Sequence, residues 1–199
     1  MLVEINNFFS DSFCDQIIKE CNVFIDKKKL NSEYNREGNT VILDQHKELQ
    51  NLDKKIFERI NLITLNRLIY IFALNISNIK DSGYSFHRYE KNDKLFTHGD
   101  GVFSELNNEK FNLRVLSLIV NLTTNENADL IFPRHNKSIK SEKGKLVAFL
   151  PHECYEHYMN NNSGKNRDIL VTWLIDSSIE CRKVNNGKKI QRLRTKSKT

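Results

Sequence analysis

Two residues separated by one glycine form the clearest chemical pattern in the sequence. His98 and Asp100 close a predicted strand, LFTHGD. Side chains two positions apart on a strand point to the same face, so this imidazole and this carboxylate can converge on one metal ion. Two histidines with one carboxylate form the facial set that binds non-haem Fe(II) and leaves coordination positions open. A second histidine must therefore come from a strand that the fold brings alongside.

Two downstream histidines, His152 and His157, are candidates for this third ligand. Arg167 lies ten residues after His157, beyond the polar turn NNNSGKN and at the start of the apolar run RDILVTWLI. A planar guanidinium can hold a carboxylate bidentately, as needed for a dicarboxylate co-substrate whose other end chelates iron. His152 has no comparable partner, so the spacing favours His157.

The elements that would position these residues change in character near residue 81. Before it, Ser10 is a predicted N-cap followed by apolar residues at helical spacing, and a second helical pattern covers roughly 46–76, with asparagines that could divide it. After it, short apolar runs alternate with polar turns, a texture typical of an all-β sandwich or barrel. We predict one α+β, mainly β domain over 1–185, with a helical N-terminal layer over 1–80 and a β core over 81–185.

Composition narrows the possible functions. The chain has 199 residues and only seven glycines, and it contains no G-x-G-x-x-G or G-x-x-x-x-G-K-[ST] loop, which argues against nucleotide chemistry. Its four cysteines form no C-x-x-C pair. No signal peptide or transmembrane segment is visible. We therefore expect a soluble protein of the cytoplasm or another reducing compartment, without a membrane partner.

Positive charge is concentrated at the C-terminus. The net charge is +6, and the sequence from Arg182 onward contains eight lysines or arginines and no acidic residue. A basic tail over 186–199 could attract the phosphates of nucleic acid. A solvated, disordered terminus is the favoured interpretation.

A longer set of motifs surrounds the candidate ligands in a fixed order. Arg88-Tyr89 precedes HGDGVF, RVLSLIVNLT begins at Arg114, KGKLVAFLPHECYEH ends at His157, and Trp173 follows Arg167 by six residues. With these motifs, the stretch from Arg88 to Trp173 resembles the catalytic domain of prolyl 4-hydroxylases and related 2-oxoglutarate/Fe(II) dioxygenases. FFSDSFCDQII near the start is similar to the short helix that precedes such domains.

The resemblance implies a double-stranded β-helix (jelly-roll) core with the N-terminal helices packed on one face. It implies that His98, Asp100 and His157 bind Fe(II) and are catalytic. It also implies that Arg167 and Tyr89 hold the distal carboxylate of 2-oxoglutarate, with O2 as the second co-substrate and ascorbate as an expected reductant. The implied reaction is hydroxylation of a C–H bond, most simply in a prolyl or other residue of a protein or peptide.

Two departures from the family pattern bear on the substrate. Asn121 stands where the family has Tyr, and Asn127-Ala128-Asp129-Leu130 replaces its Gly-Gly-Glu-Thr. They leave open a small molecule or free amino acid as substrate, or a non-catalytic β-barrel binding protein with a nucleic-acid-binding tail. Repair-type demethylases carry a second arginine soon after the co-substrate arginine; here none follows until Arg182. The loops expected to select the substrate lie around 28–45 and 101–112.

Overall fold

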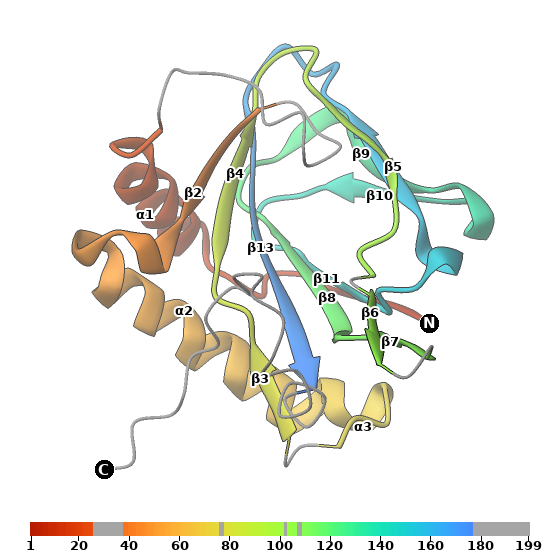
Figure 1. Cartoon of the computed structure of the whole chain (residues 1–199). Helices are drawn as coiled ribbons and strands as arrows, with labels where there is room; N and C mark the ends of the chain where they lie inside the picture. The colour runs from red at the N-terminus through yellow and green to blue at the C-terminus, as the bar shows by residue number, and fades with distance from the viewer. Residues whose placement is uncertain (26–37, 76–77, 102, 107–108, 177–199) are drawn as a thin grey trace.

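The computed structural model describes residues 1–25, 38–75, 78–101, 103–106 and 109–176 (Figure 1). The predicted basic tail over 186–199, with Arg182 before it, lies outside the described residues. So do parts of both loops that we expected to select the substrate. None of the helices in the described part of the chain has the length and apolar character needed to cross a membrane.

Two antiparallel sheets form the core. The larger has seven strands, in the order β1 (Leu2–Ile5), β11 (Leu146–Phe149), β8 (Arg114–Asn121), β13 (Arg167–Asp176), β4 (Ser85–Tyr89) and β2 (Asn39–Ile42), with β3 (Ile79–Asp81) also paired to β13. The smaller has four, in the order β10 (Lys137–Ser141), β9 (Asn125–Phe132), β12 (His157–Asn160) and β5 (Lys94–His98). A separate pair joins β6 (Phe103–Leu106) to β7 (Glu109–Asn112).

Alternation along β13 separates two buried cores. Leu170 and Leu174 point into the core shared with the helices, whereas Ile169 and Val171 point into the core between the two sheets. Side chains on a strand alternate between faces, so this one strand supports both cores. Figure 1 shows α1 and α2 on the side of the large sheet away from β5, β9 and β10. This is the predicted arrangement of a β core with helices on one face.

The first helix begins where the sequence predicted. Ser10 caps α1 (Asp11–Asn22), and its hydroxyl accepts a hydrogen bond from the backbone N–H of Phe13 at 3.3 Å. Ile17 and Cys21 are buried on the face turned to the sheet. The predicted N-cap and helical spacing are confirmed.

The second helical region is a nearly continuous run. Two short 3-10 turns, Leu43–Gln45 and Lys47–Leu49, lead into α2 (Gln50–Ile63), which continues through a π-helical turn (Thr64–Leu68) into α3 (Ile69–Ile71). The helix type predicted for roughly 46–76 is confirmed over 47–71, but the asparagines do not divide it into two helices. Apolar residues spaced by three or four bury one face, which is why the region stays helical.

The N-terminal layer is not wholly helical, which corrects the sequence prediction. β1 and β2 add strands at the two ends of the large sheet, and β3 pairs with β13. Each has only three or four residues, too few to show a period of their own. Their conformation depends on distant partners, such as β11 for β1. The strand predicted over CYEHYM also begins later, at His157, because Glu153–Tyr155 forms a 3-10 turn.

Candidate metal centre and co-substrate pocket

Two neighbouring strands of the small sheet bring the three predicted ligands together. β5 and β12 run antiparallel, with His98 directly opposite His157. Their ring centroids lie 4.5 Å apart, and Asp100 follows two residues after His98. The candidate ligand atoms of these three residues all lie within 4.8 Å of one another. One ion can therefore contact all three side chains.

Backbone carbonyls orient both imidazoles. The Nδ1 atom of His98 lies 2.7 Å from the carbonyl oxygen of Phe96, and Nδ1 of His157 lies 3.0 Å from that of Tyr155. A carbonyl oxygen only accepts hydrogen bonds, so each Nδ1 must carry the proton. Each Nε2 then presents a lone pair, the tautomer that a metal-binding histidine needs.

The charge states also suit a divalent cation. Burial would raise the pKa of Asp100, but the electrostatic interactions with the imidazoles of His98 and His157 outweigh it and hold that pKa well below the usual range. Burial lowers the pKa of His157 to about 4, against the opposing effect of Asp100. At neutral pH the site therefore offers a carboxylate and, at His157, a neutral imidazole.

Two aromatic rings pack against His157 on one side of the candidate metal site. The ring of His157 lies 5.0 Å from that of Phe149 and 5.4 Å from that of Phe132, measured between centroids. Both phenylalanines belong to the core between the sheets. They keep water from the buried imidazole and fix its plane.

The chain leaving β5 is held by an arginine of the large sheet. Arg114 donates from Nη1 to the backbone carbonyl of Asp100 at 2.9 Å, and its Cζ lies 3.6 Å from the ring centroid of Trp173. Trp173 is half-buried and packs against the core between the sheets. These contacts connect the position of Asp100 to β8 and β13.

Arg167 is the most deeply buried charge beside this centre. It is 1% exposed, and Nη2 donates to Oδ1 of Asn121 at 3.1 Å. Nε and Nη1 have no hydrogen-bond partner among the described residues. Burial lowers the pKa of Arg167 to about 10, so it stays protonated at neutral pH. Leaving buried N–H groups unpaired costs about 1–3 kcal/mol each, and a carboxylate ligand that accepts from this guanidinium would remove part of that cost.

Tyr89 lies next to Arg167 on the neighbouring strand. The two residues are directly opposite in the β4–β13 pair, and Cζ of Arg167 is 6.0 Å from the tyrosine ring centroid. Both are buried at the same end of the large sheet. The structure thus brings together the two residues that we expected to bind a distal carboxylate.

The structure separates the two candidate histidines. His152 is exposed, and its Nδ1 accepts from the backbone N–H of Cys154 at 3.2 Å. It takes no part in the cluster that contains His157. Asn121 is the site residue that sequence reasoning missed as a contact of Arg167. Its signal was a polar residue closing a mainly apolar strand, RVLSLIVN.

Comparisons with known proteins show which solved structures share the fold that carries this site. The chain matches no protein-family model and no curated protein. It is similar in structure to a viral collagen prolyl hydroxylase from Paramecium bursaria Chlorella virus-1 in complex with 2-oxoglutarate (TM-score 0.62, 19% identity, covering 88% of this chain and 95% of that one).

Two further prolyl hydroxylases resemble it as well. A prolyl-4-hydroxylase from Pseudomonas putida gives a TM-score of 0.60 at 14% identity, covering 88% of this chain and 92% of that one. A Trichoplax adhaerens prolyl hydroxylase, in complex with a hypoxia-inducible-factor peptide fragment, gives a TM-score of 0.63 at 16% identity. The match covers 94% of this chain and 87% of that one. At such low identity these matches establish the fold. The chain has the jelly-roll fold of 2-oxoglutarate oxygenases, in its prolyl 4-hydroxylase-like form, and the fold prediction is confirmed.

Proposed function

We propose that this chain is an Fe(II)- and 2-oxoglutarate-dependent oxygenase that hydroxylates a C–H bond. One observation carries the proposal. Three ligand atoms lie within 4.8 Å of one another, and the nearby guanidinium of Arg167 is fully buried, with Nε and Nη1 unpartnered among the described residues. A metal and a carboxylate would satisfy both features at once.

The residues divide this work between them. Nε2 of His98, Nε2 of His157 and the carboxylate of Asp100 would hold Fe(II) on one side and leave positions open. When bound, iron and 2-oxoglutarate together supply the oxidation: one oxygen atom of O2 enters the substrate C–H bond, and 2-oxoglutarate becomes succinate and CO2. Arg167 would anchor the distal carboxylate, with Tyr89 beside it. The rings of Phe132 and Phe149, which pack against the ring of His157, would exclude water from that side of the metal site.

For the substrate, we propose a prolyl or other residue in a protein or peptide. The support is structural similarity to several prolyl hydroxylases, one of them in complex with a peptide. A small molecule or free amino acid is the alternative, because Asn121 contacts Arg167 and the departure at 127–130 places Ala128 and Leu130 in the core between the sheets. Ascorbate would serve as the reductant that keeps iron in its Fe(II) state.

The test is succinate release by the purified protein with Fe(II), ascorbate, O2 and 2-oxoglutarate, with and without proline-containing peptides. We expect succinate to form, and a substrate peptide to gain one oxygen atom and accelerate succinate release. His157→Ala should abolish both signals, whereas His152→Ala, which changes an exposed histidine five residues away, should retain them. Equal activity of the two variants would refute the assignment of the metal ligands.

A further inference from the structure

An ion pair lies on the two strands that carry Arg167 and Tyr89, on the opposite face. Arg88 donates from Nε and Nη2 to the two carboxylate oxygens of Asp168, both at 2.7 Å. The Asp168 side chain is 2% exposed and that of Arg88 is 12% exposed. We propose that Arg88 and Asp168 are positioning residues for co-substrate binding, which fix Arg167 and Tyr89 on the opposite face of the same two strands. This inference rests on the proposed function.

Strand register connects the two pairs. In the β4–β13 ladder Asp168 is opposite Arg88, and Arg167 is opposite Tyr89. Neighbouring residues on a strand point to opposite faces. The ion pair and the proposed co-substrate residues therefore occupy adjacent positions of the same two strands and face opposite ways. A slip of one residue would turn Arg167 toward the helices. The ion pair opposes such a slip, because its two parallel hydrogen bonds fit only this register.

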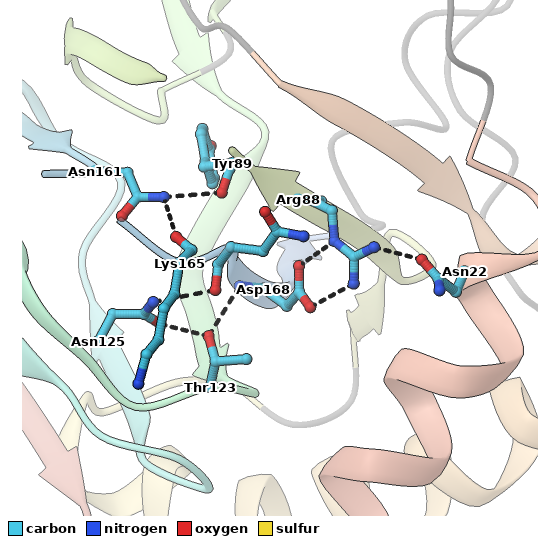
Figure 2. Close-up of polar contacts among 9 residues, drawn as sticks. Asn22, Arg88, Tyr89, Thr123, Asn125, Asn161, Lys165 and Asp168 are labelled. Atoms are coloured by element: carbon cyan, nitrogen blue, oxygen red, sulfur yellow. Dashed lines mark hydrogen bonds and ion pairs between the residues drawn. The ribbon is translucent and has the colours of Figure 1, made fainter. Parts of the chain in front are cut away.

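Asp168 is also held by its backbone. Its N–H donates to Oγ1 of Thr123 at 3.0 Å, and its carbonyl accepts from the N–H of Leu122 at 2.9 Å. On the other side of the ion pair, Arg88 donates from Nη1 to Oδ1 of Asn22, the last residue of α1 (Figure 2). The residue after Arg167 is therefore tied to β4, to the chain after β8 and, through Arg88, to α1.

The residue before Arg167 is fixed as well. Asn125 donates from Nδ2 to the carbonyl of Asn166 at 3.0 Å. Nδ2 of Asn161 lies 2.9 Å from the carbonyl oxygen of Tyr89 and 2.8 Å from that of Lys165, which closes the turn that leads into β13 (Figure 2). The backbone is thus held on both sides of Arg167.

Stability alone does not account well for a buried ion pair. Desolvation cancels much of the attraction, and well-packed apolar replacements are often as stable. A bidentate pair does, however, specify geometry, and a misplacement of about 1 Å at a binding site can cost up to a hundredfold in rate. We therefore expect its loss to affect co-substrate binding more than metal binding.

The test compares wild type with Asp168→Asn, which keeps the side-chain shape and removes the charge. Calorimetry gives the Kd for Mn(II) alone, then the Kd for 2-oxoglutarate with Mn(II) saturating. We expect Mn(II) affinity within about twofold of wild type and 2-oxoglutarate affinity reduced about tenfold, the scale of supporting-residue effects at metal sites. In turnover, KM for 2-oxoglutarate should rise more than kcat falls.

Two further variants complete the design. Arg88→Lys keeps the charge but cannot donate in the bidentate geometry, so it should retain only part of the wild-type affinity for 2-oxoglutarate. It reports on the pair even if Asp168→Asn does not fold. Lys143→Met removes the exposed Asp15–Lys143 pair and should change neither Kd.

The outcomes separate the two proposals. If wild type binds no 2-oxoglutarate in the presence of Mn(II), the proposed function fails. If wild type binds and the folded Asp168→Asn and Arg88→Lys variants bind equally well, the proposed function stands and the positioning role is refuted. An equal loss of Mn(II) and 2-oxoglutarate affinity in these variants would refute it too, since it would indicate general disruption.

Discussion

At Arg167 the sequence places a cation in the interior without enough partners. Asn121 accepts from one nitrogen, and two others have no partner in the described part of the chain. Burying an arginine in this way is unfavourable unless a ligand completes it. The guanidinium therefore indicates a carboxylate ligand more directly than the three metal-site residues do, because a histidine–aspartate cluster can also be satisfied internally.

Replacing this arginine provides the first prediction. Arg167→Met keeps most of the side-chain volume and removes every donor. Hydrogen bonds to charged groups contribute roughly 1.5–3 kcal/mol each, so losing two predicts 2-oxoglutarate binding weaker by about a hundredfold or more. Calorimetry with Mn(II) present measures it.

The control for this substitution is Arg134→Met, which changes an exposed arginine that pairs with Glu156 at the surface. It should leave the 2-oxoglutarate Kd unchanged. Unaltered binding by folded Arg167→Met would show that the distal carboxylate is held elsewhere.

The sequence identified these residues with uneven success. The strand rule predicted that His98 and Asp100 lie together, although β5 ends at His98 and Asp100 lies just beyond the strand. Pairing with His157 is non-local, but the order of His157 and Arg167 along the chain pointed to it. The hydrogen bond from Arg167 to Asn121 could not be predicted, because it depends on how β8 and β13 align.

At the level of elements, the sequence pattern predicted the helices and strands whose conformation is determined by residues close together in the chain. α1 and α2 carry an apolar face and are long enough to show it. β1, β2 and β10 have four or five residues and owe their conformation to pairing with distant strands. β10, with the sequence KSIKS, contains a single apolar residue, Ile139, and so resembles a polar loop.

Helix α2 offers a prediction at this scale. Ile56 is fully buried against the sheet, whereas Leu62 on the same helix is 63% exposed. Ile56→Ala should lower the free energy of unfolding by about 2–5 kcal/mol through lost burial and the cavity left behind. Leu62→Ala should change it by no more than about 0.5 kcal/mol.

Denaturant unfolding of the two α2 variants measures this difference. Both substitutions lie on the helical side of the large sheet, so neither should alter the Kd for Mn(II). Similar losses of stability in the two variants would contradict the assignment of the buried face of α2.

For the whole molecule, the division into two cores matters most. One core joins the helices to the large sheet, and the other lies between the sheets and surrounds the candidate site. The large sheet separates them, so its strands can be anchored from behind while their other face remains shaped for ligands. The short apolar runs predicted buried strands, but the assignment of each strand face to a core required the assembled sheets.

Ligand binding should therefore stabilise the entire fold. With Mn(II) alone at about 100 times its Kd, linkage predicts a gain of about 2.7 kcal/mol, or roughly 5–11 °C in Tm for a domain of this size. Thermal unfolding with and without ligands measures it. Chelation of the metal should reverse the shift, and Asp100→Ala should show none. A Tm unaffected by saturating metal in wild type would contradict the metal site.

The most direct test of the central claim is the visible absorption of the protein with Fe(II) under anaerobic conditions as 2-oxoglutarate is added. A 2-oxo acid that chelates Fe(II) gives a charge-transfer band, which requires metal and co-substrate to meet at one site. We predict a saturable band in wild type and in His152→Ala, and none in His157→Ala. No band in Fe(II)-loaded wild type at saturating 2-oxoglutarate, or a full band in His157→Ala, would contradict the claim.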